Sequence, residues 1–143
     1  MDKRFWVCGL VMSIAALLLG FIVHGLLLAP DYAALGTLFR SDDDSRGHLQ
    51  WIVLAHGLVG FAMTWLYAQG FSDRRSTSMQ GLRFGLAMAL FATIPGHLVH
   101  YAVQPLPAGL VARQMACGTI AMLLLGLLVA WLQPRRKVLA ELP

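Results

Sequence analysis

Charged residues are scarce in this sequence. Only 13% of its 143 residues are charged, whereas water-soluble domains carry about 25%. Hydrophobic residues make up 58% of the chain, and the mean hydropathy is +0.68. This composition excludes an ordinary water-soluble domain and is typical of a membrane protein.

Cysteines and catalytic motifs are scarce as well. Cys8 and Cys117 are the only two cysteines, and their expected positions at different membrane depths argue against a disulfide. The sequence has no nucleophile elbow, zinc-protease motif, phosphate loop or dinucleotide fingerprint. Its basic residues are spread over short segments without an aromatic platform, which argues against nucleic-acid binding. These absences favour a protein that is not an enzyme.

Long apolar runs, in contrast, are abundant. They cover residues 5–28, 49–68, 81–101 and 110–132. Each has about 20 residues, enough to cross a hydrocarbon core of ~30 Å as a helix. The first run is too long for the apolar region of a signal peptide. The sequence therefore predicts one all-α transmembrane domain over 1–143, folded as an antiparallel four-helix bundle.

The basic residues predict how the chain is oriented. Lys3 and Arg4 precede the first run, Arg74 and Arg75 separate the second from the third, and PRRK follows the fourth at 134–137. These segments share one side of a four-span chain, and short basic segments stay in the cytoplasm. We expect a multi-pass protein of the bacterial inner membrane, embedded in the lipid bilayer with both termini cytoplasmic.

Small residues recur at helical spacing in every run. In lipid, such residues mark the faces where helices approach closely. The predicted packing residues are Gly9, Ser13 and Gly20 in the first helix, Gly60 in the second, Gly81, Gly85 and Gly96 in the third, and Gly126 in the fourth. The remaining apolar faces are expected to contact lipid or another protein.

Histidines are the ionisable residues that stand out within the runs, where such groups are costly. They are His24, His56, His97 and His100. All but His97 are four residues from a packing glycine, so α-helical spacing places them on packing faces, away from lipid. His97 shares a broad helix face with His100. All four are expected in the outer third of the membrane.

Three interpretations of these histidines stay open. They could form hydrogen bonds that join the helices. They could bind haem b between two helices, or a transition metal through His97, His100 and one further ligand. They could also line a path for protons or a small solute together with Asp31.

A weak internal repeat raises the alternative of two duplicated helical hairpins. GFIVH at 20–24 matches GHLVH at 96–100, and WLYAQ at 65–69 has a fainter counterpart in WLQP at 131–134. Repeats with the same orientation would be related by an axis along the membrane normal.

The longest segment outside the runs covers residues 30–48. Its first part, DYAALGTLF, is expected to form a short amphipathic helix at the headgroup level. Asp42, Asp43 and Asp44 lack the spacing of a calcium loop and are expected in a solvated loop. Ser41 or one of these aspartates is expected to cap the second membrane helix.

Three stretches resemble a pattern shared by small bacterial four-helix membrane proteins known only as hypothetical proteins. These stretches are HGLLLAPDYAALGTLFR at 24–40, WLYAQGFSDRRSTSMQGLRFGL at 65–86 and YAVQPLPAGL at 101–110. The resemblance implies a bacterial inner-membrane protein with loops in these places. It implies no activity.

Taken together, these patterns predict a membrane protein without catalytic chemistry of its own. We expect it to form a homo-oligomer or to serve as an accessory subunit beside other membrane subunits. The first alternative is a redox protein that holds haem b or a metal near the periplasmic face. The second alternative is a pathway for a small solute or protons.

Overall fold

The structure is a computed structural model that describes residues 3–70 and 76–133. Within these ranges it contains helices, turns and loops but no strand. Four helical spans are long and apolar enough to cross a membrane: Lys3–Leu27, Leu49–Gln69, Thr77–Val103 and Ala108–Leu132. The predicted all-α fold with four membrane helices is confirmed, although the third helix begins at Thr77 rather than at Gly81.

Two of the spans change their helical type partway along. The first comprises α1 (Lys3–Gly20) and a π-helical segment, η1 (Phe21–Leu27), and the third comprises α5 (Thr77–Met88), η2 (Ala89–Thr93) and α6 (Ile94–Val103). A π-helical turn contains more residues than an α-helical turn, so the residues after it are rotated about the helix axis. Pro95 favours such an irregularity before α6, because it has no N–H to bond the carbonyl of Phe91.

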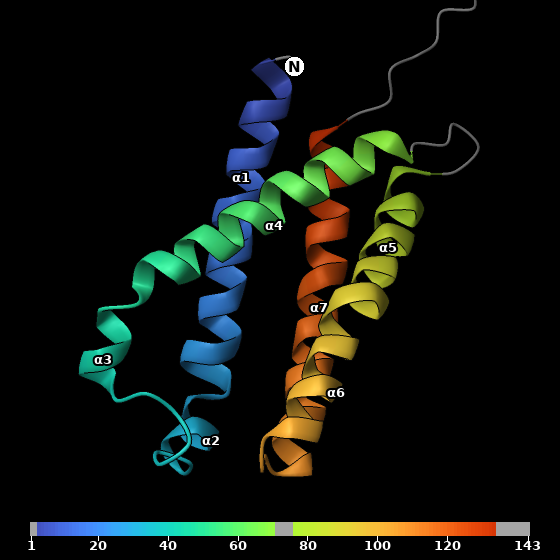
Figure 1. Cartoon of the computed structure of the whole chain (residues 1–143). Helices are drawn as coiled ribbons and strands as arrows, with labels where there is room; N and C mark the ends of the chain where they lie inside the picture. Colours follow the sequence, from blue (N-terminus) through green and yellow to red (C-terminus); the bar gives the residue numbers. More distant parts are fainter. Residues whose placement is uncertain (1–2, 71–75, 134–143) are drawn as a thin grey trace, which may run out of the picture.

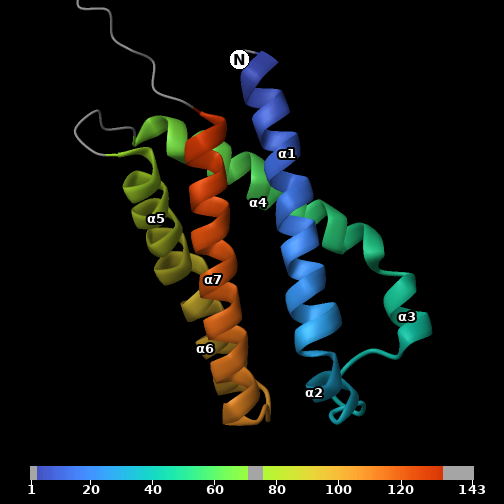
Figure 2. The ribbon, with the colours of Figure 1, turned by 180° about the vertical axis from the view of Figure 1, so that it is seen from behind.

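The remaining elements complete two helical hairpins. The second span is α4 (Leu49–Gln69), the fourth is α7 (Ala108–Leu132), and two short helices, α2 (Ala29–Ala33) and α3 (Asp42–Arg46), precede α4. α1 packs mainly on α4, and α5 packs mainly on α7. α4 crosses α1 obliquely, while α5 and α6 follow α7 along its length (Figures 1 and 2). The first described turn of α1 and the last turn of α7 lie at the same end of the bundle (Figure 1).

Glycines make the two hairpin crossings possible. A Cβ atom on Gly60 of α4 would overlap the backbone of Ser13 in α1. In the other hairpin, a Cβ atom on Gly126 of α7 would overlap the carbonyl oxygen of Gly81 and lie 2.7 Å from Cα of Gly85. The helix backbones therefore touch at both crossings, as expected where lipid supplies no hydrophobic drive for association.

Gly9 and Gly20 extend the contact between α1 and α4. A Cβ atom on Gly9 would overlap the ring of Phe61, and one on Gly20 would overlap the ring of His56. Seven of the eight predicted packing residues thus lie where two helices meet.

The prediction that Gly96 lies on a packing face is wrong. Gly96 is exposed, and a Cβ atom there would meet no atom of the described chain within 4 Å. The prediction assumed α-helical spacing from Gly85 onward, whereas η2 rotates the residues that follow it. Thr93 faces α7 instead, with its methyl carbon 2.6 Å from the place a Cβ atom on Gly118 would take.

The bundle has two small apolar cores. The larger lies around Cys8, Met12 and Ala16 of α1 and joins them to Met63, Tyr67, Leu125, Val129 and Ala130. The smaller, at the opposite end, contains Val23, Leu28 and Leu110, with Tyr32, Leu35 and Cys117 packed against it. Cys8 and Cys117 therefore belong to different cores, and both are free thiols.

Replacing Gly126 with alanine is predicted to destabilise the protein by about 1–3 kcal/mol, because the added methyl group must push two backbones apart. Gly109→Ala is the matched control, since a Cβ atom on Gly109 meets nothing within 4 Å. Thermal unfolding in detergent, followed by circular dichroism, measures both. Equal midpoints of thermal unfolding for the two variants would contradict the close contact between α5 and α7 at Gly126.

Candidate functional site

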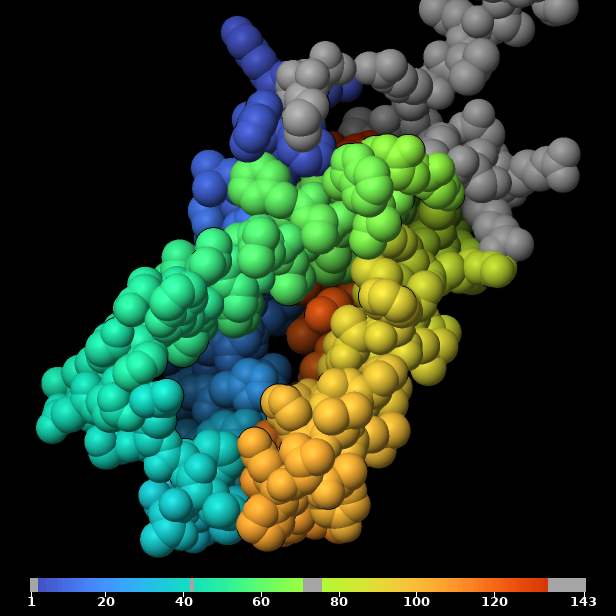
Figure 3. Space-filling model, in the orientation of Figure 1, coloured from blue at the N-terminus to red at the C-terminus, as the bar shows by residue number. Residues whose placement is uncertain are grey.

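The membrane histidines lie on three different elements. His24 belongs to η1, His56 to α4, and His97 and His100 to α6. Figure 3 shows a deep hollow framed by α4, by the α1–η1 helix and by α6. His24 is within electrostatic range of both His97 and His56. The fold thus brings together histidines that are far apart in the sequence.

Two of these histidines have hydrogen-bond partners within the chain. His24 Nδ1 lies 2.7 Å from the hydroxyl oxygen of Tyr32. His56 Nδ1 lies 2.7 Å from the carbonyl oxygen of Ile52, one helical turn earlier, so its N–H donates to that carbonyl. The Nε2 side of the His56 ring rests against Gly20 of α1.

The other two histidines, His97 and His100, lack such partners. Within the described chain, neither imidazole makes a hydrogen bond. His97 is half-buried, with Nε2 3.8 Å from the place a Cβ atom on Gly118 would take, and His100 is exposed. Both line an open hollow of about 280 Å³, together with Ala92, Thr93, Gly96 and Met122.

The expected positions of His24 and His100 need correction. Both were predicted to lie on packing faces, and both are exposed. The π-helical turns explain the difference, because α-helical spacing from Gly20 or through η2 gives the wrong face. His56 lies in a continuous α-helix and is half-buried against α1.

A polar tie, formed by side chains of α2 and the start of α7, joins the two hairpins beside His24. The Arg113 guanidinium donates to the Asp31 carboxylate at 2.6 Å, and the Gln114 amide donates to the Tyr32 hydroxyl at 3.0 Å. Burial raises the pKa of Tyr32, because the phenolate would lose its water, although the bond from Gln114 opposes this shift. Sequence reasoning missed Gln114, since nothing in the pattern showed that it would face Tyr32.

The side chains of the described residues do not assemble a protein metal site. No three His, Cys, Asp or Glu side chains in 3–70 and 76–133 are grouped so that they could hold a metal ion. The predicted site with His97, His100 and a third ligand thus lacks that third ligand here. Haem binding stays a prediction.

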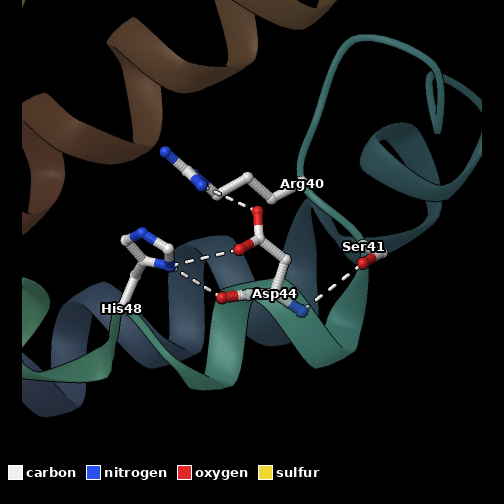
Figure 4. Close-up of polar contacts among 4 residues, drawn as sticks. All are labelled: Arg40, Ser41, Asp44 and His48. Atoms are coloured by element: carbon white, nitrogen blue, oxygen red, sulfur yellow. Dashed lines mark hydrogen bonds and ion pairs between the residues drawn. The ribbon is translucent and has the colours of Figure 1, made fainter.

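The segment before α4 forms a second polar cluster, shown in Figure 4. The Asp44 carboxylate accepts from Arg40 at 2.7 Å, and His48 Nδ1 lies 2.7 Å from the Asp44 carbonyl oxygen. Ser41 accepts the Asp44 N–H at 3.4 Å and so caps α3. The prediction that Ser41 caps the second membrane helix is wrong, because a separate short helix intervenes.

The expected structure of the rest of this segment also changes. The aspartates lie in the exposed helix α3 rather than in a loop. In the DYAALGTLF stretch, only the residues up to Ala33 are helical, and turns follow. Tyr32 and Leu35 nevertheless pack inward on the smaller core.

Comparison with protein-family models, with curated proteins and with solved structures gives no match. The candidate site must therefore be interpreted from its own geometry.

Tyr32→Phe is predicted to destabilise the bundle by about 1–3 kcal/mol, because the nearly buried Gln114 amide loses its partner. Tyr101→Phe is the control, since Tyr101 is exposed and its change should stay within about 0.5 kcal/mol. Thermal unfolding in detergent gives the comparison. A Tyr32→Phe variant as stable as Tyr101→Phe would show that the polar tie contributes nothing.

Asp44 is predicted to titrate below its ordinary pKa of 3.8, chiefly because Arg40 donates a hydrogen bond to its carboxylate. A lowered pKa means that this bond stabilises α3 at neutral pH and is lost as the pH falls through the folded-state pKa. Arg40→Gln should raise the pKa of Asp44 toward 3.8, measured by carboxyl-carbon NMR. Arg46→Gln, which removes only the weaker contact with Asp43, should leave Asp44 unchanged. An Arg40→Gln variant with the wild-type titration would contradict the pairing.

Proposed function

We propose that this chain is a bacterial inner-membrane protein without catalytic chemistry, which works as an oligomer or as an accessory subunit of a larger membrane complex. One observation carries the proposal. Every residue from Leu49 to Ala55, about two turns at the start of α4, is exposed. This third of a membrane helix is exposed on every side within its own chain.

The exposed first third of α4 results from the oblique crossing with α1. Gly57 and Gly60 hold α4 against Ser13 of α1, partly through a hydrogen bond from the Ser13 hydroxyl to the Gly57 carbonyl at 3.2 Å. Before that crossing, α4 diverges from the bundle (Figure 1). The stretch LQWIVLA is apolar apart from Gln50. It offers another membrane helix a surface that this chain leaves uncovered.

Sparse burial in the other spans supports the same proposal. Only 11% of the most apolar stretch of the third span is buried within the chain, and 22–28% in the other three. A bundle with so little internal contact is suited to work beside other proteins in the bilayer.

The charge distribution supports the proposed orientation. Lys3 and Arg4 begin α1, and the exposed Arg83 in the second turn of α5 belongs to the end of the bundle that α1 starts from. The opposite end carries Arg40, Arg46 and Arg113. In the sequence, these three are outnumbered by the basic residues that four spans assign to the other side, which are Lys3, Arg4, Arg74, Arg75, Arg135, Arg136 and Lys137. This excess of Lys and Arg favours cytoplasmic termini, and the resemblance to small bacterial membrane proteins favours the inner membrane.

A photo-reactive amino acid at Val53 tests this proposal in native membranes. Val7, equally apolar and exposed on α1, is the matched control position. We expect illumination to link Val53, but not Val7, to a protein. An adduct of twice the chain mass would identify an oligomer, and an adduct of another defined mass an accessory subunit. Absence of any protein adduct at Val53, with only monomer recovered in mild detergent, would contradict the proposal.

A further inference from the structure

The hollow on α6 combines an apolar floor with two polar side chains that have no partner in the described chain. Ala92 and Gly96, which have little or no side chain, form the floor of the hollow. Met122 of α7 forms one wall, and the imidazole rings of His97 and His100 complete the lining. Ala92, Gly96 and His100 are exposed, so the hollow is open on the outside of the described chain, within a span apolar enough to cross a membrane. A molecule dissolved in the membrane can reach it directly.

The imidazoles require a hydrogen-bond partner from outside the chain. A polar group that leaves water without forming a hydrogen bond costs free energy, and lipid tails cannot supply one. His24 and His56 meet this requirement internally, through Tyr32 and Ile52. His97 and His100 do not, and each neutral ring presents one N–H donor and one acceptor.

The first hairpin indicates what shape of ligand the hollow on α6 could hold. Residues 9–24 match residues 85–100 at seven of 16 positions, which are Gly9/Gly85, Leu10/Leu86, Met12/Met88, Ala16/Ala92, Gly20/Gly96, Val23/Val99 and His24/His100. In the first hairpin, the flat ring of His56 rests on Gly20. On the corresponding Gly96, the described chain places no atom within 4 Å of a Cβ position. Gly96 therefore lacks the planar ring that covers Gly20 in the first hairpin.

We propose that this hollow binds the head ring of a membrane-soluble quinone. Its ring would lie on Ala92 and Gly96 beside the Met122 sulfur, which packs well against flat rings. The N–H groups of His97 and His100 would donate to the ring carbonyls, and the isoprenoid tail would remain in the bilayer. The volume of about 280 Å³ lies near the lower end of the ~300–1,000 Å³ of small-molecule sites, which suits a head ring alone.

Two other ligand classes fit the hollow less well. A phosphate group is usually bound by Arg or Lys, and neither residue type lines the hollow. A metal ion would need a third ligand, which the described residues do not bring to this place. The ester carbonyl of a phospholipid could accept the same hydrogen bonds, but it lacks the flat ring that the bare backbone suits. The proposal concerns binding and includes no electron transfer.

The test uses the full chain in nanodiscs of phosphatidylethanolamine and phosphatidylglycerol, with decylubiquinone as the probe. We expect saturable binding of one decylubiquinone per chain, measured by equilibrium binding and by native mass spectrometry. Gly96→Leu should abolish binding, because its side chain fills the hollow without meeting other described atoms near its Cβ. Gly109→Leu, on an equally open glycine, is the matched control and should bind as the wild type does.

The histidine variants test whether hydrogen bonds from the imidazoles contribute to quinone binding, apart from the shape of the hollow. His97→Leu and His100→Leu should each weaken binding about tenfold, which corresponds to one hydrogen bond of about 1.4 kcal/mol. His97→Gln keeps an N–H donor and should recover part of this loss, and His48→Gln, outside the membrane spans, should change nothing. Should Gly96→Leu fail to fold, the His97→Leu and His97→Gln pair decides the question. Unchanged binding in both leucine variants, or phospholipid adducts without a quinone adduct, would overturn the proposal.

Discussion

The rest of the structure depends on the backbone contact at the glycines of each hairpin. Gly60 lies on Ser13, and Gly126 lies on Gly81 and Gly85, so closely that no side chain fits between them. In lipid, where burial of apolar side chains gives no drive for association, such contact is a main source of helix packing. Each hairpin thereby becomes a unit, and the oblique crossing at Gly60 directs the first half of α4 away from the other helices (Figure 1).

Polar side chains connect the two units mainly near their ends. At one end, the Gln133 amide donates to the Thr64 carbonyl at 2.9 Å, beside the buried thiol of Cys8. At the other end, Arg113 pairs with Asp31, and Gln114 with Tyr32. Between these ties the helices diverge and leave a hollow framed by α4, by the α1–η1 helix and by α6 (Figure 3). The same divergence leaves the start of α4 and part of α6 exposed, where we propose that a protein partner and a membrane-soluble ligand bind.

Much of this fold could be predicted from the sequence, because the length of an apolar run and the spacing of its small residues can be recognised within one segment of the chain. The four spans follow from composition, and the crossing glycines follow from their spacing along straight helices. The faces of Gly96 and His100 could not be predicted this way, since a π-helical turn changes the spacing. Pro95 was the visible signal of that irregularity, whereas η1 contains no proline. The Gln114–Tyr32 bond needs the full arrangement of both hairpins, and no local pattern shows it.

The central claim is that η2 turns Gly96 and His100 out of the helix contact and into the hollow, beside the half-buried His97. Disulfide formation tests it most directly, in a chain whose Cys8 and Cys117 are replaced by alanine. A cysteine pair at Thr93 and Gly118 should oxidise readily, because the two side-chain positions meet in the structure. A pair at Gly96 and Gly118 should remain reduced. Rapid oxidation of the Gly96 pair with a reduced Thr93 pair would mean that the third span is a regular α-helix, and it would contradict the account.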